Sequence, residues 1–172
     1  MQLRRVQTIA FAVLAASLCV DGRAALAQST GDPFIGTWRL NRAASTFDPG
    51  PPPESRTTTF EMVGDAIRHV TVTRSRWQNE NNPTGLGGTD RVEYTAKLDR
   101  QDYPITNSFL SRVSLRRIDA RTIERTGKLN GEAVERSTRT VSRDGRTLTI
   151  TTKGTNDGGP YSSVQVFERV KP

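Results

Sequence analysis

Turn signals recur about every ten residues from Thr37 onward, and this spacing most constrains the fold. Gly64-Asp65 and Asn130-Gly131 have the composition of two-residue hairpin turns, in which a residue must accept a positive φ angle. Arg143-Asp144-Gly145 suits a three-residue loop with glycine in the left-handed conformation. Runs of β-branched residues lie between these signals, and no convincing helical period follows residue 27. The pattern predicts consecutive antiparallel strands joined by hairpins.

Nine segments are predicted to be strands, and Asp90–Asp99 is the clearest because apolar and polar residues alternate along it. Strictly sequential hairpins favour one up-and-down, or meander, β-barrel of about eight to ten strands, because a Greek key needs a long crossover. The proline cluster Pro49–Pro53 is expected to be a rigid connector, and Gln78–Gly88 the longest loop. The predicted strands are Gly36–Asn41, Ser55–Val63, Ala66–Arg74, Asp90–Asp99, Arg112–Ile118, Arg121–Leu129, Glu132–Ser142, Thr147–Gly154 and Tyr161–Val170.

Residues 1–27 have the three parts of a cleavable signal peptide. Arg4-Arg5 supplies the positive start, Ile9–Val20 the apolar stretch and Ala25-Leu26-Ala27 the cleavage site. The apolar stretch is too short to span a bilayer, which takes about 20 residues. We expect cleavage after Ala27 and a periplasmic or secreted protein, exported by either the general secretory or the twin-arginine route.

The expected mature chain, residues 28–172, is one domain with a net charge of +5 and no cysteine. The only cysteine of the sequence, Cys19, lies in the predicted signal peptide, so the mature chain can form no disulfide. Its basic residues are interspersed with acidic ones rather than forming a run. Together with the expected export, this predicts no nucleic-acid partner and leaves the oligomeric state open.

The two ends of the predicted barrel carry a family resemblance. Gly36-Thr37-Trp38 early and Val166-Phe167-Glu168-Arg169 late resemble the ends of lipocalin-like barrels of the calycin superfamily, including secreted bacterial members. The resemblance implies that Trp38 and Arg169 stack and close one end of the barrel. Fatty-acid-binding members have an Arg-x-Tyr pair where this chain has Gln165 and Phe167, so their carboxylate clamp is not implied here.

The turns also predict which side chains share a face, because a one-residue shift moves every side chain of a strand to the other face. With Asn130-Gly131 as a loop, Arg125 lies opposite Arg136, and with Arg143–Gly145 as a loop, Arg136 lies opposite Thr152. This alignment gathers aliphatic residues on one face, which we expect to be the interior. The predicted inward residues are Ile123, Arg125, Gly127, Val134, Arg136, Thr138, Thr140, Leu148, Ile150 and Thr152.

Two arginines directly opposite each other on an inward face would repel one another and resist burial. One interpretation is a site for a carboxylate, phosphate or sulfate, with threonine hydroxyls as further partners. Alternatively, both side chains reach water at an open barrel mouth or pair with Glu124 or Glu135. A β-bulge in Glu132–Ser142 could also turn one of them outward.

Candidate ligand-binding residues come from the inward face, the last strand and the edge of the longest loop. Trp77 could gate the mouth of a pocket or simply cover the barrel rim, and Tyr94 could contact the apolar part of a ligand. The candidates are Arg125, Arg136, Thr138, Thr140, Thr152, Trp77, Tyr94 and Gln165.

Three function classes remain open on the sequence. We expect a non-enzymatic barrel that binds a small amphipathic or anionic molecule in its interior. One alternative is a filled barrel with a structural or interaction role in the cell envelope. The other is a lipocalin-like isomerase or hydrolase, for which His69 is the only obvious titratable candidate. No motif assigns a catalytic residue, a cofactor or a metal-ligand set, since a lone histidine is a poor one.

Overall fold

A computed structural model of the chain describes residues 31–75 and 88–171. In these two stretches the regular structure consists of eleven β-strands, and no helix occurs there. The strands are β1 (Gly36–Leu40), β2 (Thr46–Asp48), β3 (Ser55–Val63), β4 (Ala66–Ser75), β5 (Gly88–Ala96), β6 (Tyr103–Thr106), β7 (Arg112–Asp119), β8 (Thr122–Leu129), β9 (Glu132–Val141), β10 (Thr147–Asn156) and β11 (Gly159–Arg169).

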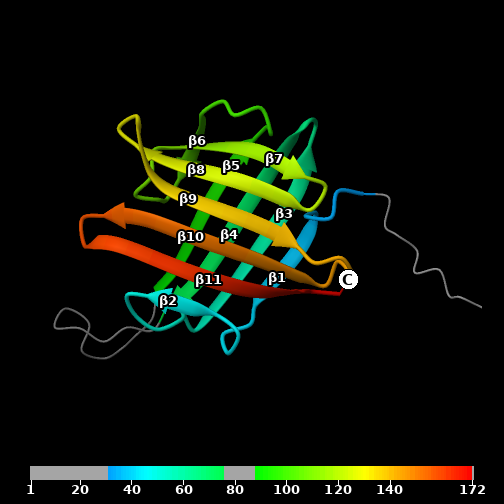
Figure 1. Cartoon of the computed structure of the whole chain (residues 1–172), viewed down its shortest axis with the longest axis horizontal. Helices are drawn as coiled ribbons and strands as arrows, with labels where there is room; N and C mark the ends of the chain where they lie inside the picture. Colours follow the sequence, from blue (N-terminus) through cyan, green and yellow to red (C-terminus); the bar gives the residue numbers. More distant parts are fainter. Residues whose placement is uncertain (1–30, 76–87, 172) are drawn as a thin grey trace, which may run out of the picture.

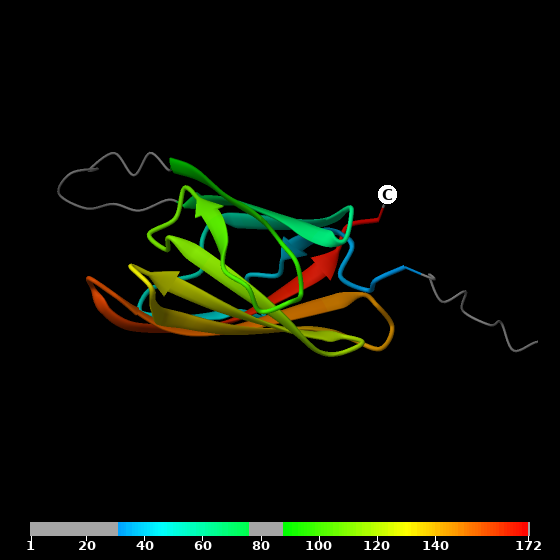
Figure 2. The same cartoon turned by 90° about the horizontal axis from the view of Figure 1, so that it is seen from above.

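The strands form one antiparallel barrel in which β1 pairs with both β3 and β11 and so closes a ring of ten strands. β2 pairs with the other half of β11, next to the stretch that β1 covers. Figure 1 shows β8 to β11 running across the molecule in front of β3 to β5, and Figure 2 shows these two groups as separate layers. The predicted meander barrel of about eight to ten strands is therefore confirmed.

All nine predicted strands are present, and the two that the sequence did not reveal, β2 and β6, have only three and four residues. The two short hairpin turns also form as predicted. Val63 pairs with Ala66 around Gly64-Asp65, and Leu129 pairs with Glu132 around Asn130-Gly131. Asn130 and Gly131 both have positive φ angles, 50° and 87°, as this type of turn requires.

The predicted register of β9 is wrong, for two reasons. A β-bulge between Gly127 and Lys128 shifts the pairing with β8, so that Arg125 lies opposite Ser137 and not opposite Arg136. The loop before β10 is one residue longer than predicted, because Ser142 and Thr147 still pair and Val141 lies opposite Leu148. As a result, the inward side chains of β9 are Glu135, Ser137, Arg139 and Val141, whereas Val134, Arg136, Thr138 and Thr140 are not buried.

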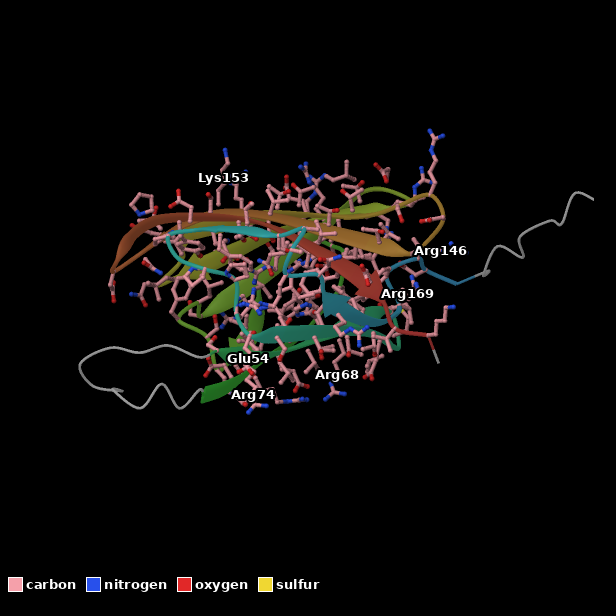
Figure 3. The ribbon with its side chains drawn as sticks, turned by 90° about the horizontal axis from the view of Figure 1, so that it is seen from below. Glu54, Arg68, Arg74, Arg146, Lys153 and Arg169 are labelled. Carbon is pink, nitrogen blue, oxygen red and sulfur yellow. The ribbon has the colours of Figure 1, made fainter. Side chains whose placement is uncertain are left out.

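One end of the barrel is closed around Trp38, which is fully buried. The guanidinium of Arg169 lies 4.0 Å from the centre of the Trp38 ring and donates to the backbone oxygens of Pro33, Ile35 and Gly145. The Trp38 indole nitrogen in turn donates to the oxygen of Phe34 at 2.9 Å. Figure 3 shows Arg169 at this end of the barrel. The contact that the family resemblance implies between Trp38 and Arg169 is present.

Candidate ligand-binding site

The barrel encloses a cavity of about 510 Å³, within the range of about 300–1,000 Å³ that is typical of small-molecule sites. At its inner end the cavity is bounded by core side chains such as Phe167. At the other end it reaches exposed residues, among them Asp90, Asn107 and Asn156, so it communicates with solvent there. The interior is therefore neither filled nor sealed.

The register of β8 to β11 arranges the cavity wall in rows of side chains. The innermost polar row is Ile123, Arg139, Ile150 and Gln165, which are paired in that order across the four strands. The next row toward the opening is Arg125, Ser137, Thr152 and Ser163. The outermost is Gly127, Glu135, Gly154 and Tyr161. Charged and hydroxyl groups thus lie deep inside the barrel.

Arg125 and Glu135 form a buried ion pair in this wall, and Tyr161 supports it. The Tyr161 hydroxyl donates to Glu135 Oε2 at 2.6 Å, and Arg125 Nε donates to Ser137 Oγ at 3.4 Å. Burial, followed by the positive charge of Arg139, lowers the pKa of Arg125 to about 10. Arg125 therefore stays charged at neutral pH, and its charge is compensated by Glu135.

Arg139 has no such partner. Arg139 is only 4% exposed, and its Nε and Nη1 atoms are buried without a hydrogen-bond acceptor among the described residues. No carboxylate of the described chain forms an ion pair with it. Buried donors of a charged group are normally satisfied, because an unpaired buried charge is strongly unfavourable. An unsatisfied guanidinium beside a solvent-connected cavity therefore indicates a place where an acceptor binds.

Arg56 is a second guanidinium whose described partners are all uncharged. It donates to Thr73 Oγ1 at 2.9 Å and to Gln165 Oε1 at 2.7 Å, and it lies over the Phe47 ring. Burial lowers the pKa of Arg56. These contacts hold the side chain at the seam between β2, β3 and β11 without neutralising it.

His69 belongs to an aromatic stack on the opposite wall. Its ring lies 4.7 Å from the rings of both Phe60 and Tyr94, and its Nε2 is 2.8 Å from Thr58 Oγ1. Burial, with the positive charges of Arg139 and Arg125, holds the pKa of His69 well below its ordinary value. His69 is therefore neutral at neutral pH.

The interior consequently carries an excess of positive charge. Among the described lining residues, three arginines face one buried glutamate, and His69 adds no charge. The two aspartates of the lining, Asp48 and Asp90, are exposed at the opening, where water screens them. A bound anion would compensate this excess positive charge of the wall.

Four of the eight predicted ligand-binding residues line the cavity: Arg125, Thr152, Tyr94 and Gln165. Arg136, Thr138 and Thr140 are exposed on the outer face of β9, because the bulge and the longer loop reverse the orientation of that strand. Trp77 lies outside the described residues.

Sequence reasoning missed the inward orientation of Arg139 and of Glu135, and it missed Arg56. It named Glu135 only as an alternative ion-pair partner, and Glu135 does pair with Arg125. Val141 could have revealed the orientation of Arg139 and Glu135. Placing this apolar residue inward beside Leu148 also turns Arg139 and Glu135 inward.

Within residues 31–75 and 88–171, no group of three or more His, Cys, Asp or Glu side chains is arranged to hold a metal ion. The same stretches contain no helix long and apolar enough to cross a membrane.

Comparison with known proteins finds similarity in structure only. No family model matches the chain, and no curated protein matches it in sequence. A zebrafish ileal bile-acid-binding protein complexed with cholic acid is 12% identical, with a TM-score of 0.45, over 80% of this chain and 99% of that one. The siderocalin Ex-FABP, described as having dual ligand specificities, is 12% identical, with a TM-score of 0.39, over 80% of this chain and 71% of that one. Similarities of this size assign neither a family nor a ligand.

Proposed function

We propose that this protein is an exported, non-enzymatic barrel that binds a small anionic, amphipathic molecule in its interior. The observation that carries the proposal is Arg139, a buried guanidinium with unsatisfied donors beside a cavity of about 510 Å³. A carboxylate, sulfonate or phosphate would accept hydrogen bonds from Arg139 and compensate its charge. The apolar part of such a ligand would pack against Ile150, Ile105 and Phe167, which also line the cavity.

The cavity favours this function over the filled structural barrel, which predicts an interior occupied by side chains. The titratable groups of the wall favour binding over catalysis. Glu135 is already paired with Arg125 and accepts from Tyr161, and His69 is buried against Thr58. A general base must have access to the proton that it removes, whereas Glu135 and the Nε2 atom of His69 are engaged within the protein.

The test uses the amphipathic anion 1-anilinonaphthalene-8-sulfonate, whose fluorescence rises in apolar surroundings. We expect saturable binding to the wild type and at least tenfold weaker binding to Arg139→Gln, which loses the charge. Tenfold corresponds to about 1.4 kcal/mol, close to the lower end of the range of about 1.5–3 kcal/mol for hydrogen bonds to charged groups.

The matched control is Arg136→Gln, which removes an exposed arginine from the outer face of the same strand. Its affinity should stay within twofold of the wild type. Equal affinities for Arg139→Gln and the wild type, with both proteins folded by circular dichroism, would refute the proposal.

A further inference from the structure

The cavity holds two guanidinium groups, and not one, that have no carboxylate partner in the described chain. Arg125 is compensated by Glu135, which leaves Arg139 and Arg56. Arg139 makes no hydrogen bond with the described residues through Nε or Nη1, and Arg56 bonds only to neutral oxygens of Thr73 and Gln165. The uncompensated charge of the interior is therefore +2.

The two arginines come from different strands, Arg139 from β9 and Arg56 from β3. Arg139 pairs with Ile150, and Ile150 pairs with Gln165, so the backbones of Arg139 and Gln165 are two strand spacings, or about 10 Å, apart. Arg56 reaches the far side of this row, where its Nη1 lies 2.7 Å from Gln165 Oε1. Ile150 lies between Arg139 and Gln165 in this row, and its apolar side chain lines the cavity.

From this arrangement we infer that the ligand is a dianion with two separated acidic groups, a dicarboxylate in its simplest form. One carboxylate binds Arg139, the other binds Arg56, and the apolar spacer crosses Ile150. This inference rests on the proposed function and specifies its ligand class.

The alternatives compensate the wall less completely. A monoanion at Arg139 leaves Arg56 without a counter-charge, and a monoanion at Arg56 leaves Arg139 unsatisfied. A single doubly charged group would have to contact two guanidiniums that come from different strands, β9 for Arg139 and β3 for Arg56. Two acidic groups on one flexible chain supply a separate acceptor for each guanidinium.

The experiment compares acids of equal chain length by isothermal titration calorimetry. Octanedioate and decanedioate are titrated into the wild type beside octanoate and decanoate. Burying a second carboxylate is unfavourable unless a cation receives it. We therefore expect the dicarboxylate to bind at least tenfold more tightly than the matching monocarboxylate.

Variants then assign the two ends. Arg139→Gln and Arg56→Gln should each reduce the dicarboxylate preference to less than threefold, while Arg136→Gln should leave it unchanged. The wild-type comparison needs no variant, so the test does not depend on how well the variants fold.

A monocarboxylate that binds as tightly as its dicarboxylate, or more tightly, would refute the dianion and leave the proposed function intact. If none of the four acids binds and anilinonaphthalenesulfonate binds equally to the wild type and Arg139→Gln, both the inference and the proposed function fail.

Discussion

His69 shows how the environment of one residue determines its chemistry. Its ring is stacked between Phe60 and Tyr94, and the positive charges of Arg139 and Arg125 oppose its protonation. At neutral pH the imidazole is therefore a neutral aromatic group with a hydrogen bond to Thr58.

This environment predicts a pH-dependent stability. The pKa of His69 lies well below 6.5 in the folded protein and returns to about 6.5 on unfolding. Protons therefore bind the unfolded chain first, and the free energy of unfolding falls as the pH falls below about 6.5, by up to about 1.4 kcal/mol per pH unit. Urea unfolding between pH 5 and pH 8 measures this slope.

The control is His69→Gln, because the chain contains a single histidine and most carboxylates titrate at lower pH. The variant should be less stable at pH 8 and should lose most of the slope between pH 6.5 and pH 5. An unchanged slope would show that another group is responsible.

At the scale of the elements, Gly154 and Tyr161 determine how β10 and β11 present the outer end of the cavity. These residues are paired across the two strands, and the Tyr161 ring lies over Gly154 on its way to Glu135. A Cβ atom on Gly154 would lie 2.6 Å from Cζ and from the hydroxyl of Tyr161. The glycine is therefore what allows Tyr161 to reach the Arg125–Glu135 pair.

We expect Gly154→Ala to displace Tyr161 and remove its hydrogen bond to Glu135. The free energy of unfolding should fall by about 1–3 kcal/mol, the usual cost of leaving a buried polar group unsatisfied. Gly88→Ala is the matched control, because no described residue lies within 4 Å of a Cβ at that strand position. In a Tyr161→Ala background, Gly154→Ala should have little effect, and an undiminished cost there would contradict the explanation.

The elements also show how far the sequence predicts this fold. Strands and turns with strong local signals were predictable, as Asp90–Asp99 and Asn130-Gly131 illustrate. The side chains of β9 that point inward could not be predicted, because their orientation depends on one bulge and one extra loop residue. A shift by one residue moves every side chain of a strand to the opposite face. Arg125 was placed correctly, whereas Ser137 and Arg139 took the inward positions that were predicted for Arg136 and Thr138. The place of Arg56 in the cavity wall could not be predicted, because its contacts come from strands that are distant from it in the sequence.

At the scale of the whole molecule, export remains a proposal that depends on residues 1–27. If these residues are a signal peptide cleaved after Ala27, the protein recovered from the exported fraction should have the mass of residues 28–172. Native mass spectrometry measures this mass and, in the same spectrum, any small molecule that is released from the barrel. A chain that retains residues 1–27 would contradict the proposed processing.

The closing pair of the ring has a consequence for the order of events during synthesis. Trp38 and Arg169 come from nearly opposite ends of the chain, yet they lie side by side where β1 meets β11. Hairpins such as β3–β4 can form as soon as their residues are available, whereas the ring must wait until the last strand has been made. A ribosome-bound chain that lacks β11 would therefore have no closed ring, and the edge of β1 that pairs with β11 would be unpaired. The cavity, and with it any ligand binding, would come into existence only with the final residues.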